Sequence, residues 1–309
     1  MTILAGDVGG TKTFLRCIDA AGAIVAEERF ESGRFATFEA LVGAFQQRLR
    51  QPIDAACFAV AGPVIGSRAE VTNVGWEIEA SALQTSLHIP RVSIINDFFA
   101  VALGVPLLGA DDLLPLQRGN RVHAAPIAIL GAGTGLGEAM VTFDGTRWNV
   151  TPSEGGHADF APQDETQAKL YLHLHERYGH VSWERVLSGM GLTNIYEFFT
   201  GRNEEPARIA ELAASGDAAA EQTLATFVDI YGAEAGNMAL RLLARGGVFL
   251  AGGIAAKNVD RFTDGRFVAA FLRKGRFTDL LQSIPVDLIT NEKVGLIGAT
   301  EMARRVSRG

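Results

Sequence analysis

Short apolar runs that end in glycine or aspartate recur along this chain. Residues 3–8 (ILAGDV) form the first run, which predicts a buried strand leading into a glycine turn. Residues 14–19 and 23–30 follow as two more strand candidates, and a hairpin-type turn from Asp19 to Gly22 separates them. The chain is therefore predicted to begin as strand, turn, strand, turn, strand.

Helical spacing appears next, between residues 35 and 49. Five apolar side chains share one face there: Phe38, Leu41, Val42, Phe45 and Leu49. Residues 56–62 and 92–97 read as two further strands. A helix is expected to begin at Asp97, which could serve as its N-cap, and to continue through residues 98–104.

The same order of elements restarts after Pro126. Residues 127–133, 136–143 and 147–152 are predicted strands, with a turn at Asp144 and Gly145. Gly6 and Gly131 are 125 positions apart, and Asp19 and Asp144 have the same spacing. The pattern indicates a structural duplication, one copy per domain, although chance alignment of two hairpins would look the same.

The second half of the chain is mostly helical from residue 165 to residue 243. Strands are predicted at 248–254 and 286–290, and a closing helix at 295–306. A chain of 309 residues exceeds the usual size of one hydrophobic core. We therefore expect an α/β protein with a smaller N-terminal domain, residues 1–118 plus about 291–309, and a larger one, residues 119–290.

Composition narrows the functional class. The formal net charge of -7 argues against a basic nucleic-acid surface, while backbone amides could still hold a nucleotide. The two cysteines, Cys17 and Cys57, lie in apolar stretches and are predicted to be buried thiols. No signal-like start or membrane-length apolar run occurs, so we expect a cytoplasmic protein without a membrane partner.

Three predicted strands end in glycine-rich turns, at residues 7–11, 131–137 and 251–254. Glycine permits positive φ and close approach to the backbone, and consecutive exposed N–H groups can bind an anion. The sequence has no G-x-x-x-x-G-K-[ST] motif, which excludes a Walker P-loop. The first two turns lead into strands without spelling G-x-G-x-x-G, which argues against a Rossmann dinucleotide site.

Two aspartates follow buried strands and are candidates for chemistry. Asp7 ends the first strand, and an acid there needs a partner or a metal; the alternative is a carboxylate that caps the turn. Asp97 stands at the mouth of a predicted parallel strand, where it is well placed as the general base of a phosphoryl transfer. The alternative for Asp97 is a plain helix cap.

A second set of polar residues lies downstream. Glu154 and His157 flank two glycines and could converge on vicinal hydroxyls; metal binding or a structural histidine are the alternatives. Glu184 follows Ser182, a plausible N-cap, and taken alone would be a solvated helix residue.

Together these motifs resemble a known family. Asp-x-Gly-Gly-Thr, Gly-x-Gly-Thr-Gly and Ala-Gly-Gly look like the phosphate and adenosine motifs of the sugar kinase–Hsp70–actin superfamily. With IINDF, EGGHADFAP and HVSWERVLSG in the expected order, residues 6–253 resemble the bacterial glucokinase family. The resemblance implies two ribonuclease-H-like (actin-like ATPase) domains with a cleft between them.

The resemblance also implies roles for individual residues. Asp97 would deprotonate the 6-hydroxyl of glucose, and Asp7 would help to hold Mg²⁺, through water or the nucleotide. The implied sugar contacts are Asn96, Asp97, Glu154, His157 and Glu184, with Asn73, in the segment of Thr72 and Trp76, less firmly matched. The implied ATP contacts are Gly6, Asp7, Val8, Gly9, Gly10, Thr11, Lys12, Gly133, Thr134, Gly135, Gly252 and Gly253.

The expected reaction converts ATP and glucose to ADP and glucose 6-phosphate, a step of glycolysis, in a homodimeric enzyme. Residues 12–14 depart from the Asn-Ala-Arg of many members, and no cysteine lies beyond Cys57, unlike the zinc cluster of the related repressor/ORF/kinase family. Another acceptor, such as fructose, mannose or an N-acetylhexosamine, is the alternative. A sugar-responsive repressor is disfavoured, because the phosphate turn at residue 6 leaves no room for a helix-turn-helix domain.

Overall fold

The computed structural model describes residues 1–49 and 51–308. The chain divides into two compact units. Unit 1 comprises Met1–Gly109 together with the C-terminal segment that begins at Asn291, and unit 2 comprises Ala110–Thr290. Each unit contains its own central sheet with helices packed against it.

Unit 1 is built on a five-stranded sheet in the order β3-β2-β1-β4-β8. Strand β1 pairs antiparallel with β2 and parallel with β4, and β4 pairs parallel with β8. The register places Val8 beside Val60 and Val60 beside Asn96, so three strands end at one edge of the sheet. The predicted strands are confirmed with the bounds β1 Ile3–Val8, β2 Lys12–Ile18, β3 Ile24–Glu31, β4 Ala55–Val60 and β8 Val92–Asn96.

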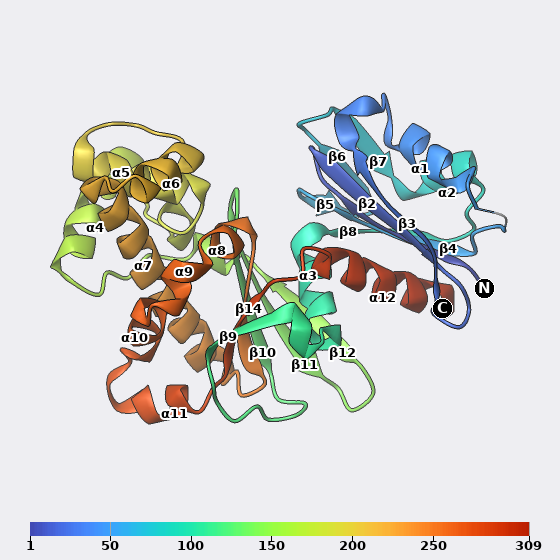
Figure 1. Ribbon diagram of the computed structural model, residues 1–309. Helices are drawn as coiled ribbons and strands as arrows, with labels where there is room; N and C mark the ends of the chain where they lie inside the picture. Colours follow the sequence, from blue (N-terminus) through green and yellow to red (C-terminus); the bar gives the residue numbers. More distant parts are fainter. Residues whose placement is uncertain (50, 309) are drawn as a thin grey trace. The chain divides into compact units, whose positions relative to one another are not determined.

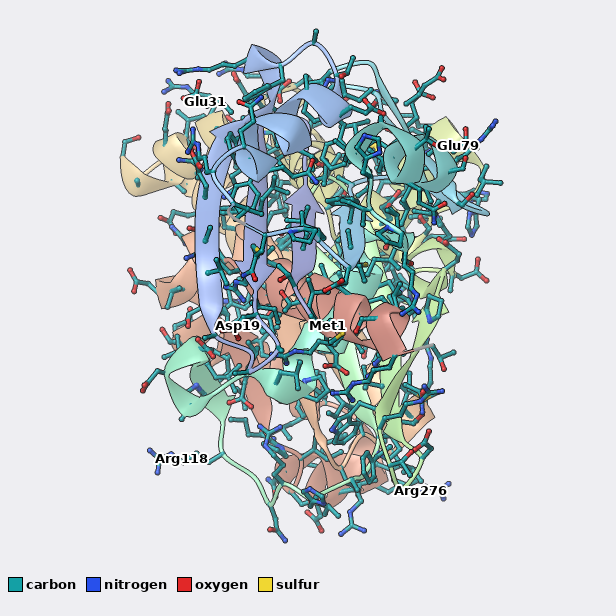
Figure 2. All side chains as sticks on the ribbon, turned by 90° about the vertical axis from the view of Figure 1, so that its right-hand side faces the viewer. Met1, Asp19, Glu31, Glu79, Arg118 and Arg276 are labelled. Carbon is teal, nitrogen blue, oxygen red and sulfur yellow. The ribbon has the colours of Figure 1, made fainter. Side chains whose placement is uncertain are left out.

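The turn between β2 and β3 forms as the sequence predicts. The Oδ1 atom of Asp19 accepts hydrogen bonds from the N–H groups of Ala21 and Ala23, both at 2.9 Å, and Gly22 adopts φ 88°. Asp19 and Glu31 lie at opposite ends of this hairpin (Figure 2). Lys12 pairs with Glu31, so the first glycine turn lies at the Glu31 end.

Two helices of unit 1 differ from the sequence prediction. Helix α1 is shorter than residues 35–49 and spans Phe38–Gln46, because Thr37 caps it by accepting a hydrogen bond from the N–H of Ala40. Helix α3 spans Asp97–Gly104, but its N-cap is Asn96 and not Asp97. Asp97 is therefore the first helical residue.

The C-terminal helix α12, Val294–Arg308, returns to unit 1. It lies alongside β1 and β4 and packs closely on α3, as the red helix beside the blue strands shows (Figure 1). Leu296, Ala299 and Ala303 are fully buried in this layer. The remaining elements of unit 1 are α2 Ala80–Leu87, η1 Ser32–Arg34, η2 Val105–Leu107 and a small sheet of β5 Val64–Ile65, β6 Arg68–Val71 and β7 Trp76–Glu79.

Unit 2 repeats the arrangement of unit 1 around a six-stranded sheet, in the order β12-β11-β10-β13-β14-β9. Strands β10, β11 and β12 form two antiparallel hairpins. Strand β10 pairs parallel with β13, as β1 does with β4. The predicted duplication is thus present in the strand order of both sheets. The bounds are β9 Leu113–Gln117, β10 Ile127–Ala132, β11 Leu136–Phe143, β12 Trp148–Ser153, β13 Gly247–Ala251 and β14 Val286–Ile289.

The helical part of unit 2 surrounds the long helix α7, whose Phe227, Ile230 and Tyr231 are buried in the core. Helices α4, α5, α6 and α7 fill the segment between residues 165 and 243 that was predicted to be helical. The helices are α4 Glu165–Tyr178, α5 Gly189–Thr200, α6 Pro206–Ala214, α7 Ala218–Leu242, α8 Gly253–Lys257, α9 Val259–Thr263, α10 Arg266–Leu272 and α11 Thr278–Gln282. Short 3-10 turns are η3 Ala110–Asp112, η4 Gly155–His157, η5 Trp183–Arg185 and η6 Gly275–Phe277.

The boundary between the units differs from the predicted one. The sequence predicts the boundary after residue 118, whereas the compact units divide after Gly109. The reason is β9, which pairs antiparallel with β14 and so belongs to the sheet of unit 2. A strand at the far edge of a sheet has no local signal that says which unit it joins.

The prediction of two buried thiols is confirmed, because Cys17 and Cys57 are free and fully buried.

Within residues 1–49 and 51–308, no helix combines the length and apolar character needed to cross a membrane.

Candidate functional site

The first glycine turn follows β1, and Ser32, the first residue of η1, is hydrogen-bonded to it. The hydroxyl of Ser32 donates to the carbonyl of Gly9 at 2.6 Å and lies 3.0 Å from the hydroxyl of Thr13. The N–H of Ser32 donates to the carbonyl of Thr11, and that of Gly9 donates to the carbonyl of Lys12. The turn is therefore fixed at both ends before any ligand binds.

The glycines of this turn serve a different purpose from the one expected. Neither Gly9 nor Gly10 has a positive φ. A β-carbon at Gly10 would instead lie 2.6 Å from the β-carbon of Asn73. Gly10 is thus required by close packing, and this packing brings the predicted Asn73 to the turn.

Gly6 and Val8 lie below the turn and not on its surface. Val8 has no exposed area, and a β-carbon at Gly6 would collide with the side chains of Phe58 and Leu15. These two predicted nucleotide contacts therefore form part of the core that supports the turn. Thr11 and Lys12, by contrast, are exposed.

Asp7 lies at the end of β1, beside the first turn of helix α12. Gly295 makes room for it, because a β-carbon there would lie 2.8 Å from the Oδ2 atom of Asp7. Burial and the charge of Asp97 raise the pKa of Asp7 to about 6, against a lowering effect of Lys12. The two carboxylates therefore create a negative potential that a cation would relieve.

Asp97 is held by Asn96 and by the start of helix α3. The Oδ1 atom of Asp97 accepts hydrogen bonds from the N–H of Phe98 at 2.8 Å and the side-chain amide of Asn96 at 3.0 Å. Among the described residues, no residue other than Asp97 itself donates a hydrogen bond to the Oδ2 atom. Burial raises the pKa of Asp97, while hydrogen bonds from Phe98, Asn96 and the backbone N–H of Asp97 lower it.

Asn96 is committed to this local structure. Its amide nitrogen donates to the carbonyl of Gly62 at 3.0 Å as well as to Asp97. Its Oδ1 atom caps α3 by accepting from Phe98 and Phe99. These hydrogen bonds fix the side chain of Asn96 against Asp97 and the start of α3.

Three more predicted residues of unit 1 have partners or positions that bear on their roles. The ammonium of Lys12 forms an exposed ion pair with Glu292 at 3.0 Å. Trp76 is 2% exposed and donates to the carbonyl of Phe35, so it belongs to the core, whereas Thr72 is exposed.

The second glycine turn, after β10, lies against Glu184. The N–H of Leu136 donates to the Oε2 atom of Glu184 at 3.0 Å, and a β-carbon at Gly135 would come within 2.5 Å of the same atom. The carbonyl of Gly133 accepts from the N–H of Gly189. Neither Gly133 nor Gly135 has a positive φ, and the space around Gly133 is open. Thr134 is exposed between them.

The third turn lies next to the second, because Gly131 and Ala251 pair in the parallel strands β10 and β13. Gly252 adopts φ 91° and packs against the carbonyl of Ala132, and a side chain there would be both strained and in collision. Gly253 is exposed and begins the short helix α8.

Glu154 and His157 approach each other on a 3-10 turn. The Oε2 atom of Glu154 lies 3.8 Å from the Nε2 atom of His157, and both side chains are exposed. Among the described residues, no group of three or more His, Cys, Asp or Glu is arranged to hold a metal ion. The pair is therefore open to a polar ligand rather than engaged in the core.

A short pairing holds this turn beside the segment that contains Glu184. Asp159 and Ser182 form an isolated antiparallel bridge, and the N–H of Trp183 donates to the carbonyl of Ala158. Ser182 does not cap a helix through its side chain; a 3-10 turn follows it, and Ser188 caps α5 instead. Glu184 is thus a half-buried residue at the glycine turn and not a solvated helix residue.

Sequence reasoning missed the residues that hold these groups in place. Ser32, Gly62 and Gly295 contact the turn, Asn96 or Asp7 from distant parts of the chain. Glu138 and Tyr231 lie behind the turns of unit 2. The hydroxyl of Tyr231 accepts from the N–H of Ala132 at 3.2 Å and lies within 3.5 Å of the carbonyls of Leu130 and Ala251.

Comparison with known proteins gives one consistent answer. A family model described as "Glucokinase" matches residues 4–306. A glucokinase of Trichormus variabilis is 42% identical, and the match covers 98% of this chain and 99% of that protein. A crystal structure of glucokinase from an Antarctic psychrotroph has a TM-score of 0.89 and 31% identity, with 98% and 99% of the two chains covered.

A more distant structure shares the fold. It is a ROK family glucokinase from Streptomyces griseus, solved in complex with glucose and AMPPNP. Its TM-score is 0.63, with 20% identity over 99% of this chain and 100% of that chain.

Proposed function

Because the chain belongs to the glucokinase family and has its actin-like ATPase fold, we propose that it transfers the γ-phosphoryl group of ATP to the 6-hydroxyl of glucose, with Asp97 as the base. The proposed role of Asp97 rests on the unequal environments of its two carboxylate oxygens. One carboxylate oxygen is fixed by Phe98 and Asn96, and among the described residues no other residue donates to the second oxygen. An oriented carboxylate with a free oxygen is what a hydroxyl acceptor needs.

The Oδ2 atom of Asp97 accepts the proton of the 6-hydroxyl while the sugar oxygen forms a bond to phosphorus and the bond to ADP breaks. Burial at Asp97 favours proton acceptance by raising the pKa, and Asn96 holds the carboxylate in one orientation. Asn96 acts in this scheme through Asp97.

Backbone amides of the glycine turns suit the phosphates of ATP. Thr11, Thr134 and Gly253 are exposed at the three turns, and Gly133 has open space around it. Such N–H groups bind phosphate oxygens without net positive charge. Lys12 would contribute charge after leaving Glu292, an exposed pair that contributes little to stability.

Mg²⁺ fits Asp7. Carboxylate oxygens are the ligands that Mg²⁺ takes in nucleotide sites, usually one or two of them with phosphates and waters. The raised pKa of Asp7 reflects burial and the charge of Asp97, and a bound cation would relieve both. When bound, the ion neutralises charge on the transferring phosphoryl group.

Glu154, His157 and Glu184 are the proposed sugar-binding groups of unit 2. Carboxylates accept hydrogen bonds from hydroxyls, and an imidazole can accept one and donate one. Glu154 and His157 are already 3.8 Å apart and exposed, and Glu184 is fixed by Leu136. Asn73, which packs on Gly10, is the corresponding candidate in unit 1.

The test of the base is the substitution Asp97→Asn, which keeps the shape and the N-terminal position in α3. We expect kcat to fall by about 10²–10⁴-fold, since general-base catalysis contributes that much, with little change in glucose binding measured by calorimetry. The exposed Asp279→Asn is the matched control and should leave kcat unchanged. Near-normal turnover of Asp97→Asn would remove Asp97 from the role of base.

A homodimer in the cytoplasm is the remaining family expectation and forms part of the proposal. Sedimentation at several protein concentrations measures the first point directly. A coupled assay with fructose, mannose and N-acetylhexosamines beside glucose measures how strictly the acceptor is selected.

A further inference from the structure

Glu138 is an acidic residue in the core of unit 2 that the proposed reaction does not use. It lies on β11, is 2% exposed, and neither carboxylate oxygen has a hydrogen-bond partner among the described residues. Buried polar atoms are nearly always paired, because an unpaired one loses its hydration without compensation. An orphaned carboxyl group in the core therefore calls for an explanation.

The carboxyl group of Glu138 supports the proposed sugar-binding turn from beneath. A β-carbon at Gly155 would collide with the Oε2 atom of Glu138, so the two residues are in direct contact. Gly155 lies between Glu154 and His157 in the same 3-10 turn. Any movement of the Glu138 carboxyl group is therefore passed to the backbone that carries both side chains.

Two charged residues of helix α7, Glu234 and Arg241, act on Glu138, and neither is a free cation. Glu234 is 0% exposed and accepts hydrogen bonds from Arg241 and Asn237, both at 2.7 Å. Arg241 is thus already paired, and Tyr231 is bound to the strand ends. Burial and the charge of Glu234 raise the pKa of Glu138 to about 7, against a lowering effect of Arg241.

We propose that Glu138 is a positioning residue for glucose, with its uncharged carboxyl group holding the Glu154–His157 turn in the binding conformation. The inference rests on the proposed function of that turn. An uncharged carboxyl group can remain buried and unpaired here, whereas a carboxylate near Glu234 has to gain water. Water enters most readily by displacing the exposed turn, which weakens the grip of Glu154 and His157 on the sugar.

The consequence is a pH dependence of glucose affinity. With a pKa of about 7, about nine tenths of Glu138 is uncharged at pH 6 and about one tenth at pH 8. If only the uncharged form binds well, KM for glucose rises about tenfold over this range, while kcat changes little. The effect of Glu138 is measured as the difference from a variant that lacks only its charge.

That variant is Glu138→Gln, which keeps the shape and stays uncharged. At pH 6 we expect its KM for glucose to equal that of the unsubstituted protein. At pH 8 we expect its KM to be several-fold lower than that of the unsubstituted protein at the same pH. Glu138→Ala, which removes the support under Gly155, should raise KM at both pH values. The exposed Glu165→Gln is the matched control and should follow the unsubstituted protein.

Urea unfolding gives an independent readout. The folded-state pKa of Glu138 is raised, so its contribution to stability is fully present below the unfolded pKa near 4.5 and is lost as pH rises through about 7. The Glu138→Gln protein should therefore have a higher urea midpoint than the unsubstituted protein at pH 8, and the same midpoint or a lower one at pH 5.

Coinciding KM profiles of the unsubstituted protein and Glu138→Gln would overturn the inference, as would a KM of the unsubstituted protein that does not rise between pH 6 and pH 8. The second observation needs no variant and holds even if Glu138→Gln folds poorly. Failure of the proposed function would look different, because the unsubstituted protein would then phosphorylate no glucose at any pH.

Discussion

At the scale of single residues, the site depends on side chains that hold other side chains in place. The side-chain nitrogen of Asn96 donates to the carbonyl of Gly62 and to the carboxylate of Asp97, and its side-chain oxygen caps α3. Ser32 fixes the carbonyl of Gly9 in the first turn. The Asp97 carboxylate and the first glycine turn are thus held in place by neighbouring side chains.

Tyr231 is the residue whose hydroxyl joins the strand ends behind two glycine turns. We expect Tyr231→Phe to lower the free energy of unfolding by about 1–3 kcal/mol, because the buried N–H of Ala132 loses its acceptor. We also expect KM for ATP to rise, since the second and third turns follow directly from β10 and β13. Urea unfolding and steady-state kinetics measure the two effects.

The control for this substitution is Tyr171→Phe, at a partly exposed ring stacked on His175. It should change stability by less than about 0.5 kcal/mol. Equal effects of the two substitutions would show that the hydroxyl of Tyr231 does not organise the turns.

At the scale of elements, α3 and α12 form the support of Asp97 and Asp7. Asp97 begins α3, and Asp7 lies against Gly295 in the first turn of α12. The two helices touch through Gly104 and Gly298, where a β-carbon would collide with the backbone of the other helix. Their contact fixes the distance between the two carboxylates.

Gly298→Ala tests this helix contact. The added methyl group meets the carbonyl of Ala100, so we expect a loss of about 1–3 kcal/mol in stability and a lower kcat as α3 moves away. Gly43→Ala is the opposite case, because Gly43 lies inside α1 with nothing near its missing side chain. That substitution should stabilise the protein by about 0.5–1 kcal/mol and leave kcat unchanged. Thermal unfolding and turnover of both variants give the comparison, and a harmless Gly298→Ala would contradict it.

Elements that carry their own pattern were predictable from the sequence. The hairpin at Asp19 forms through hydrogen bonds within five residues, and the strand β1 is a continuous apolar run. The start of α3 at Asp97 is confirmed, but its N-cap is Asn96. Asn96 and Asp97 are both good capping residue types, and Asn96 has the extended backbone that a cap requires. Local chemistry decides such features, and local chemistry is visible in the sequence.

At the scale of the whole molecule, the duplication seen in the 125-residue spacing appears in both sheets, where a hairpin precedes a parallel strand. The partners of the site residues were not predictable in this way. Gly155 and Glu138, Asp7 and Gly295, or Gly10 and Asn73 meet only after the chain has folded. No periodicity or motif in the sequence marks these pairs, and the edge strand β9 shows the same limit for the boundary between units.

The central claim is that this chain phosphorylates glucose at its 6-hydroxyl with ATP. The most direct measurement is phosphorus NMR of the products formed by the purified protein with ATP, Mg²⁺ and glucose. The account predicts glucose 6-phosphate and ADP in equal amounts. Formation of ADP and free phosphate without a phosphorylated sugar, or phosphorylation at another hydroxyl, would contradict it.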